Sequence, residues 1–510
     1  MKVSYTLFAL THRFICRSVP ALLHGSVTKQ QRRKRRIMKK KVVSALLCAT
    51  MVATMFAGCG SKESDNNAST PDTSKADTSS EVSEPAEDTG KVLNIYCWNE
   101  EFKSRITAHY PDYKEVDATH GKIGDVDVVW NITPNDDNAY QNNLDATLLN
   151  QADAPADDKI DLFLVEADYA LKYVDTDYTM PIKDLGITDD DLSKQYQYTK
   201  DIVTDSNGVL KGLSWQGCPG VLFYNRDAAK EVLGTDDPDK VQEALSTWDK
   251  FDKVAEQAAA KGYKMLSGYD DSYRVFSNNV SAPWVDSNNK IVIDDNIMKW
   301  VDQTKKYTDK GYNNKSSLWD STWAADQGPS GKVFGFFYST WGINFTLLGN
   351  SLATPVKEGG KEEVGNGIYG DYAVCEGPQS YYWGGTWICA AAGTDNANLV
   401  KDVMKTLCCD KATMKKITED TQDYTNTTSG MNEIASSNFK SDFLGGQNHI
   451  KLFAKSAPKI SMKNISSYDQ GLNEEFQKAM KDYFDGNVTK DKALDNFYKA
   501  AIEKYPNLSK

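Results

Sequence analysis

The stretch "GVLFYNRDAAKEVLG", residues 220–234, decides the fold class, because it places a strand and a helix directly after one another. Val221 to Tyr224 form a short apolar run typical of a buried strand, and the residues after it favour a helix that ends at Gly234. Further segments with a strand or helix pattern are 91–102, 159–168, 246–264, 294–312, 331–341 and 396–420, and the last of these is predicted as one long helix. The helical segment 294–312 has one apolar stripe, predicted to face the core, made of Ile297, Trp300, Val301 and Tyr307. This alternation predicts an α/β protein with largely parallel sheets.

The first 58 residues differ in composition from the rest of the chain. They contain 12 Lys and Arg and no Asp or Glu, so the net charge of −12 for the whole chain leaves −24 for residues 59–510. Nucleic-acid affinity depends on Lys and Arg side chains that neutralise phosphates. An acidic body therefore argues against nucleic acid as a partner.

A secretory signal peptide is predicted over residues 38–58, where a basic head is followed by an apolar run of about 15 residues, too short to span a membrane. The run ends in "FAGC", residues 56–59, which resembles a bacterial lipobox with Phe where Leu is commoner. The resemblance implies cleavage before Cys59 and lipid on its thiol. An ordinary signal peptide followed by an incidental cysteine is the alternative. Residues 1–37 are interpreted as a mis-assigned N-terminal extension, with translation starting at Met38.

Residues 59–90 are interpreted as the lipidated Cys59 and a disordered tether. Beyond the cysteine, the segment contains no aromatic residue and a single valine, so it cannot bury enough apolar surface to order itself. Folded sequence is expected from residue 91. A lipid on Cys59 would hold the protein at the outer face of the cell membrane of a Gram-positive bacterium.

Polar and aromatic side chains follow several predicted strands at the point where each strand ends. In open α/β sheets, ligands bind beyond the carboxyl ends of the strands. Rings with a polar group suit a solvated cleft, and glycines let a backbone approach a ligand closely. Core packing is the alternative for each ring. The candidate residues are Trp98, Asn99, Glu100, Asp168, Trp215, Tyr338, Trp341, Trp383, Gly384 and Gly385.

Catalytic and metal-binding motifs are missing from the sequence. After Cys59 the histidines are His109, His120 and His449, widely spaced, and no H-E-x-x-H, G-x-S-x-G, P-loop or Rossmann glycine motif occurs. The sequence therefore predicts no enzyme activity, no metal site and no cofactor. Carboxylates are abundant, so a glycosidase pair stays open on spacing alone.

Six segments in order resemble one family: the lipobox with its tether, "IDLFLVEADY…MPIKDLGI", "GVLFYNRDAAKEVLG…STWDKFDKVAEQAAAKGY", "GKVFGFFYSTWGINF", "WGGTWICAAAGTDNANLVKDVMKTL" and "AMKDYFDGNVTKDKALDNF". Together they resemble family 1 extracellular solute-binding proteins, the carbohydrate-binding subunits of bacterial ABC importers and relatives of maltose-binding protein. The resemblance implies a two-lobed periplasmic-binding-protein-like fold of type II, with the ligand cleft between the lobes. It assigns 91–213 plus 384–430 to lobe one and 214–383 plus 431–510 to lobe two.

The resemblance also implies a function and a set of roles. The chain would be a monomer that binds an extracellular carbohydrate, an oligosaccharide, and delivers it to the permease subunits of an ABC importer. Trp341 and Tyr338 would offer a platform for a sugar ring, Tyr468 a further ring at a helix start, and Trp383 would lie where the chain crosses between lobes. A glycoside hydrolase, which would turn sugar over, and a non-catalytic surface polysaccharide adhesin, which would bind polymer on an open face, are the alternatives.

Overall fold

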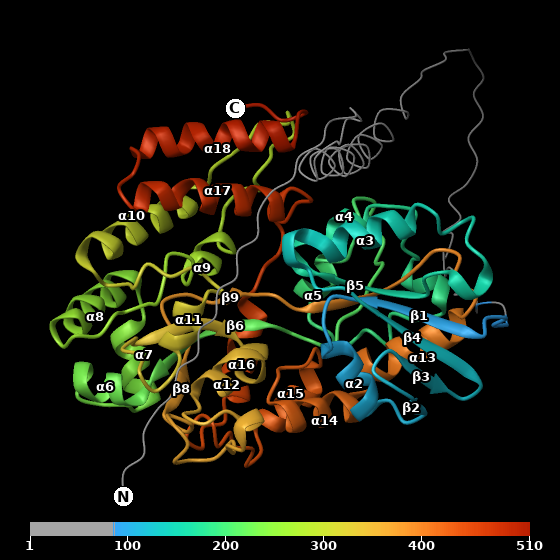
Figure 1. Ribbon diagram of the computed structural model, residues 1–510, viewed down its shortest axis with the longest axis horizontal. Helices are drawn as coiled ribbons and strands as arrows, with labels where there is room; N and C mark the ends of the chain where they lie inside the picture. Colours follow the sequence, from blue (N-terminus) through green and yellow to red (C-terminus); the bar gives the residue numbers. More distant parts are fainter. Residues whose placement is uncertain (1–84, 86) are drawn as a thin grey trace, which may run out of the picture. The chain divides into compact units, whose positions relative to one another are not determined.

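The computed structural model describes Pro85 and residues 87–510 (Figure 1). The predicted N-terminal extension, signal peptide, Cys59 and most of the tether lie outside these residues. The first strand begins at Val92. Within the described part, none of the helices combines the length and the apolar character that a membrane span requires.

The first lobe is built on a six-stranded sheet in the order β10-β5-β1-β4-β3-β2. Strand β1 pairs in parallel with β4 and β5, whereas β10 is antiparallel to β5, and β2 and β3 are antiparallel additions at the other edge. The strands are β1 (Val92–Cys97), β2 (Tyr113–Glu115), β3 (His120–Ile123), β4 (Val126–Ile132), β5 (Leu162–Glu166) and β10 (Thr386–Ala390).

The second lobe is built on a four-stranded sheet in which β6 pairs with β7, β8 and β9, always antiparallel. The strands are β6 (Pro219–Asn225), β7 (Gly335–Ser339), β8 (Tyr372–Cys375) and β9 (Tyr381–Tyr382). The prediction of largely parallel sheets is therefore wrong, although the α/β class is right.

The strand directions follow from how the chain passes between the lobes. Strands β6 and β10 both begin where the chain crosses and run away from that point, while β1, β5, β7 and β9 end there. A crossing strand is consequently antiparallel to its neighbours in either sheet. The same arrangement brings the ends of β1, β5, β7 and β9 to the crossing, which is where the candidate residues follow them.

Three stretches, 213–219, 382–388 and 423–427, are called the crossing segments below. Leu213 pairs with Ile388, Pro219 with Tyr382, and Gln216 with Thr425, so the three stretches lie side by side. The lobe boundaries at 213/214 and 383/384 stay a prediction.

Helices cover both sheets (Figure 1). Those of the first lobe are α2 (Glu101–His109), α3 (Ala139–Leu148), α4 (Ala170–Val174), α5 (Gln197–Asp201), α13 (Ala397–Cys408) and α14 (Lys411–Thr421). The remaining helices are α6 (Arg226–Leu233), α7 (Pro238–Leu245), α8 (Trp248–Ala260), α9 (Tyr273–Ser277), α10 (Asp295–Lys310), α11 (Ser321–Asp326), α12 (Leu348–Ser351), α15 (Thr428–Ala435), α16 (Ile450–Ser456), α17 (Asp469–Phe484) and α18 (Lys490–Lys504).

Three hydrophobic cores hold these layers together. One joins β1 to α2 and α13 through residues such as Ile95, Phe102 and Val403. Another lies among α9, α10 and the neighbouring pair α17 and α18, with Trp300 fully buried. The largest packs on the second sheet and continues into the first lobe as far as Tyr140. Burial of this apolar surface is the main stabilising contribution to the fold.

The segment 396–420, expected as one helix, is broken into α13 and α14 at Cys409 and Asp410. Asp410 has extended backbone and its side chain accepts a hydrogen bond from the Thr413 amide at 2.7 Å, which caps the start of α14. An aspartate that can cap a new helix competes with continuation of the old one.

Candidate functional site

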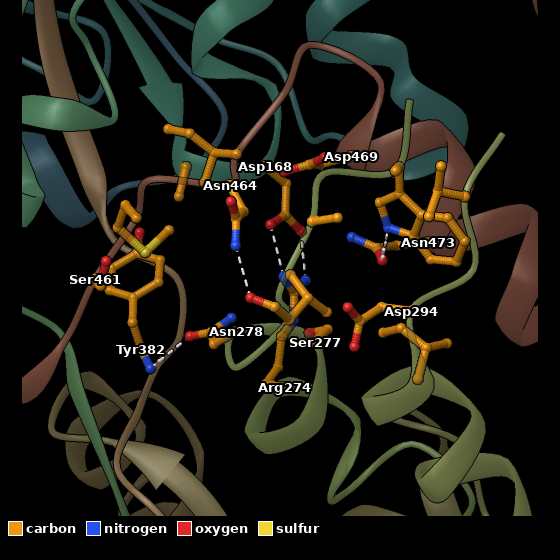
Figure 2. A pocket seen from close by; sticks show the side chains of 18 residues that line it. Asp168, Arg274, Ser277, Asn278, Asp294, Tyr382, Ser461, Asn464, Asp469 and Asn473 are labelled. Atoms are coloured by element: carbon orange, nitrogen blue, oxygen red, sulfur yellow. Dashed lines mark hydrogen bonds and ion pairs between the residues drawn. The ribbon is translucent and has the colours of Figure 1, made fainter. Parts of the chain in front are cut away.

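A pocket lies between the lobes, next to the crossing segments (Figure 2). Asp168 and Ala167 contribute from the end of β5, Arg274 and Asn278 from α9 and the residue after it, and Tyr382 from β9. The start of α17 and the loop before it close the far side, and the cavity measures about 60 Å³. Of the residues predicted from the sequence, Asp168 alone lines this pocket.

An ion pair between Asp168 and Arg274 connects the lobes across the pocket (Figure 2). The guanidinium donates two parallel hydrogen bonds, one from Nη1 to Asp168 Oδ1 at 2.6 Å and one from Nη2 to Oδ2. Both side chains are about four-fifths buried, with 20% and 21% of their surfaces exposed. Bidentate pairs of this kind are among the stronger polar contacts and fix the orientation of both groups.

Two further carboxyl groups lie beside this pair. Glu166 ends β5 and accepts a hydrogen bond from the Asp168 amide at 2.8 Å; burial and then the negative charge of Asp168 raise the pKa of Glu166. Burial also raises the pKa of Asp469, at the start of α17, to about 7, although hydrogen bonds from Ser466 favour its ionised form. The site therefore holds carboxyl groups that carry protons near neutral pH and can donate as well as accept hydrogen bonds.

Several buried polar atoms at this edge of the sheets have no hydrogen-bond partner among the described residues. They include the hydroxyls of Tyr382 and Tyr169, Asn131 Nδ2 and Asn135 Oδ1. A buried polar group without a partner is uncommon in native structures and costs stability. Such groups are what a hydroxyl-rich ligand would satisfy.

Four rings that contact one another, Trp319, Trp341, Phe345 and Trp383, form an aromatic patch, and Trp383 directly follows the pocket residue Tyr382 in the sequence. Trp341 contacts Trp383 edge-on at 5.1 Å between ring centroids and is stacked along Trp319 at 6.2 Å. Trp319 and Phe345 are 56% and 58% exposed. Sequence reasoning predicted Trp341 and Trp383 but missed the two exposed rings.

Gly384 and Gly385 leave room for side chains of the protein itself. Both have left-handed backbone, with φ of 72° and 108°. A Cβ on Gly384 would lie 3.0 Å from Trp341 Nε1, and one on Gly385 would lie 2.8 Å from Cys218 Sγ. Trp341 Nε1 donates a hydrogen bond to the Trp383 carbonyl at 2.9 Å, so the missing side chain makes room for a ring that is held in place.

The end of β1 presents a half-buried ring but few free polar groups. Trp98 packs edge-on against Tyr140 and Tyr169, at 5.6 and 6.3 Å between centroids. Asn99 Oδ1 accepts from the Glu101 amide at 3.0 Å, and the Glu100 side chain is 70% exposed beside Lys103. The Asn99 side-chain oxygen is therefore already bonded to the first amide of α2, and Glu100 faces solvent.

The structure does not bring Trp215, Tyr338 and Tyr468 to the pocket. Trp215 and Tyr338 are fully buried, so neither offers a face to a ligand. Tyr468 packs edge-on against Tyr505, and its hydroxyl accepts a hydrogen bond from Asn507 at 2.8 Å. In "ISSYDQ" it is the next residue, Asp469, that reaches the pocket. Sequence reasoning predicted the Tyr468 ring and missed the Asp469 carboxyl beside it.

A buried polar network joins the lobes through the crossing segments. Gln216 Nε2 donates to Glu101 Oε1 at 3.0 Å and to Asp423 Oδ2 at 2.9 Å, and Gln216 Oε1 accepts from the Thr386 amide at 2.9 Å. Thr340, which follows β7, donates to the other Asp423 oxygen at 2.5 Å. Burial raises the pKa of Glu101, and the charge of Asp423 adds to this.

No metal centre is evident in residues 85 and 87–510, since nowhere do three His, Cys, Asp or Glu side chains meet in a way that would hold an ion. The cysteines of this part are all free, and Cys97, Cys218, Cys375, Cys389 and Cys408 are buried.

A family model described as bacterial extracellular solute-binding protein matches residues 118–443, which is more than half of the chain. The chain belongs to this family. No curated protein matches it in sequence.

Solved structures show the same fold for this solute-binding protein. An extracellular solute-binding protein of family 1 superposes with a TM-score of 0.63 at 14% identity, covering 81% of this chain and 99% of the other. The ABC-transporter-associated binding protein of B. animalis subsp. lactis Bl-04, solved with β-1,6-galactobiose, gives 0.61 at 15% identity, covering 82% and 99%. The lacto-N-biose-binding protein of Bifidobacterium longum gives 0.59 at 13% identity, covering 84% and 100%. The two-lobed periplasmic-binding-protein-like architecture is thereby confirmed.

Proposed function

We propose that this solute-binding protein binds an extracellular oligosaccharide in the cleft between its lobes and delivers it to the permease subunits of an ABC importer. Two observations carry the proposal: the polar pocket is lined by Tyr382, whose buried hydroxyl has no partner among the described residues, and the aromatic rings of Trp341 and Trp383 follow strands that end at the same crossing. Proteins of the same fold were solved with β-1,6-galactobiose and lacto-N-biose, which supports a sugar as cargo.

A sugar matches both parts of this site. Its hydroxyls can accept from Arg274 and Tyr382 and donate to Asp168, and charged partners make such hydrogen bonds stronger. The C–H faces of a pyranose are apolar and remove ring surface from water when they stack on tryptophan. Neither part alone distinguishes a sugar from other polar or apolar ligands.

The lobes have to part for a sugar to enter. A cavity of about 60 Å³ is small beside the 300–1,000 Å³ or so of ordinary ligand pockets. Because Asp168 and Arg274 belong to different lobes, separating this pair widens the cavity. Domain closure around the ligand is the behaviour described for periplasmic binding proteins.

The protein is proposed to bind sugar without cleaving it. A glycosidase needs one carboxyl to protonate the leaving oxygen and a second as nucleophile or base. In this pocket, Arg274 donates a hydrogen bond to each oxygen of Asp168, which disfavours Asp168 both as the acid and as the nucleophile or base. Incubation of pure protein with β-1,6-galactobiose should leave the disaccharide intact by chromatography, and release of galactose would establish the hydrolase alternative.

Calorimetric titration with β-1,6-galactobiose, lacto-N-biose, maltose and their trisaccharide homologues tests the binding itself. Thermal unfolding gives an independent readout, because a ligand at 100 times its Kd stabilises the folded protein by about 2.7 kcal/mol. We expect binding of at least one sugar with one-to-one stoichiometry, as for a monomer. Heat and thermal shift with a long polysaccharide but with none of the short sugars would instead support the adhesin.

Anchoring through Cys59 is part of the proposal and concerns residues outside the described part. The "FAGC" sequence and the polar tract after it predict lipid on the Cys59 thiol and retention at the outer face of the membrane. In cells, Cys59→Ser should move the protein from the membrane fraction to the medium. Full retention of the variant in the membrane fraction would contradict the anchor.

A further inference from the structure

We infer that Trp319 and Phe345 form an outer subsite that binds one more pyranose ring of the cargo beyond the polar pocket. The inference rests on the proposed function, because it takes the ligand to be a sugar. It adds that the protein selects oligosaccharides by length, through a pair of rings outside the pocket.

These two rings are unusual in their exposure. Among the large hydrophobic side chains that are exposed in the described part, Trp319 and Phe345 are the aromatic ones, and the others are valines and a leucine. The two rings contact each other edge-on, with centroids 6.0 Å apart. Two exposed aromatic rings in contact form a surface that a ligand can cover, because single exposed hydrophobics are ordinary but clustered ones are not.

The backbone holds Trp319 outward in an unfavourable conformation. Its φ of 72° lies in the left-handed region, which bulky residues rarely occupy. Asp320 fixes the turn on both sides of it, because its carboxylate accepts from the Ser317 amide and from the Trp323 amide, each at 2.8 Å. Backbone strain that the surroundings maintain is concentrated at binding sites.

Phe345 is presented by an equally uncommon element. It lies in the π-helical stretch Ile343–Leu347, directly after Gly342, and Ile343 and Leu347 are buried while Phe345 is exposed. Such stretches are rare and occur frequently at functional sites. Two separate irregular segments therefore present neighbouring rings to solvent.

The outer rings lie next to Trp341, a ring of the candidate site. Trp319 is stacked along Trp341 at 24° and lies 6.3 Å from Trp383, whose predecessor Tyr382 lines the polar cavity. A ligand that rests on the partly exposed Trp341 ring can thus extend to Trp319 and Phe345. This path accommodates successive rings of an oligosaccharide, whereas a single sugar in the pocket does not reach its end.

The expected effect depends on sugar length. A stacked ring that removes about 50 Å² of apolar surface corresponds to about a tenfold change in affinity. Trp319→Ala and Phe345→Ala should therefore weaken binding of tetrasaccharides about tenfold each and change that of disaccharides less than twofold. The probes are maltose and β-1,6-galactobiose with their tetrasaccharide homologues, measured by calorimetric titration. Val364→Ala, an exposed residue 75% accessible and outside the patch, is the matched control.

A second variant separates binding from folding. Trp319→Gly removes the ring and accepts the left-handed backbone, so relief of backbone strain offsets part of the packing that is lost, and the variant should be more stable than Trp319→Ala while losing the same tetrasaccharide affinity. Equal losses for disaccharide and tetrasaccharide, or no loss for either, would overturn the outer subsite while leaving the proposed function intact. Failure of the natural protein to bind any of these sugars would overturn the proposed function and this inference together.

Discussion

At the scale of single residues, Trp341 connects the two parts of the candidate site. Its indole nitrogen is tied to the Trp383 carbonyl, and its ring contacts both Trp319 and Trp383. Stacking on one ring contributes about 1.3 kcal/mol by area, far below the 8 kcal/mol or so of micromolar binding. The larger part of the binding free energy must come from hydrogen bonds and from water released as the lobes close. Trp341 contributes to this part by holding the ligand where its hydroxyls can form those bonds.

Trp341→Ala should consequently weaken sugar binding by one to two powers of ten, more than area alone predicts. Calorimetric titration with the sugar that binds the natural protein measures the change. The control is Trp300→Phe, which alters a fully buried ring in the α10, α17 and α18 core and should lower stability while leaving affinity unchanged. Unchanged affinity in the Trp341 variant would remove this residue from the site.

At the scale of elements, the Gly384 turn determines where the Trp341 ring lies. Gly384→Ala meets two costs: about 1–2 kcal/mol for a side chain in left-handed backbone, and a contact of 3.0 Å with Trp341 Nε1. Gly393→Ala meets the first cost alone, because its φ is 82° and a Cβ there has no neighbour within 4 Å. Urea unfolding should show a larger loss for Gly384→Ala, with weaker sugar binding in that variant only. Equal losses in both would show that Trp341 moves aside freely.

The buried polar network around Gln216 is a second feature for which a change in stability can be predicted. Gln216→Leu leaves the buried Glu101 and Asp423 carboxyls without their shared donor. A buried polar group that loses its hydrogen-bond partner costs about 1–3 kcal/mol, so urea unfolding should show a loss of that order. Gln303→Leu, which removes a 3.2 Å bond to Asp252 at a partly exposed position, should cost less than about 1 kcal/mol. Similar small losses in both variants would contradict a structural role for the network.

Sequence patterns predicted the elements better than their arrangement. The stripe of Ile297, Trp300, Val301 and Tyr307 predicted the buried face of α10, because helical periodicity reports burial directly. Strand direction was predicted wrongly, since it depends on where the chain crosses between lobes and not on local composition. Arg274 lies in a five-residue helix without any motif, so only the folded structure places it against Asp168.

At the scale of the whole molecule, buried carboxyl groups should make stability depend on pH. Burial raises the pKa of Asp271 to about 7, and of Asp161 and Asp270 to about 6. The folded protein therefore holds these protons more tightly than the unfolded chain, in which Asp has a pKa of about 3.9. Their contribution to stability is complete below that value and is lost as the pH rises towards 7.

Urea unfolding at fixed pH values from 5 to 7 should show a falling free energy of unfolding, by up to about 1.4 kcal/mol per pH unit for each such group. Asp271→Asn should flatten this dependence, because the amide does not titrate and still accepts a hydrogen bond from the Trp323 indole or the Gly268 amide. A free energy that rises with pH over this range, or an unchanged slope in the variant, would contradict the assignment.

The Asp168–Arg274 pair also has a consequence for how fast cargo is captured. A sugar reaches the cavity only in molecules whose lobes have separated, so the apparent Kd equals the intrinsic Kd divided by the fraction of open molecules. At high sugar concentration, the rate of capture cannot exceed the rate at which the pair dissociates. The Asp168–Arg274 pair thus also sets an upper limit on the rate of sugar capture. A receptor with a weaker pair would bind its cargo faster and release it sooner.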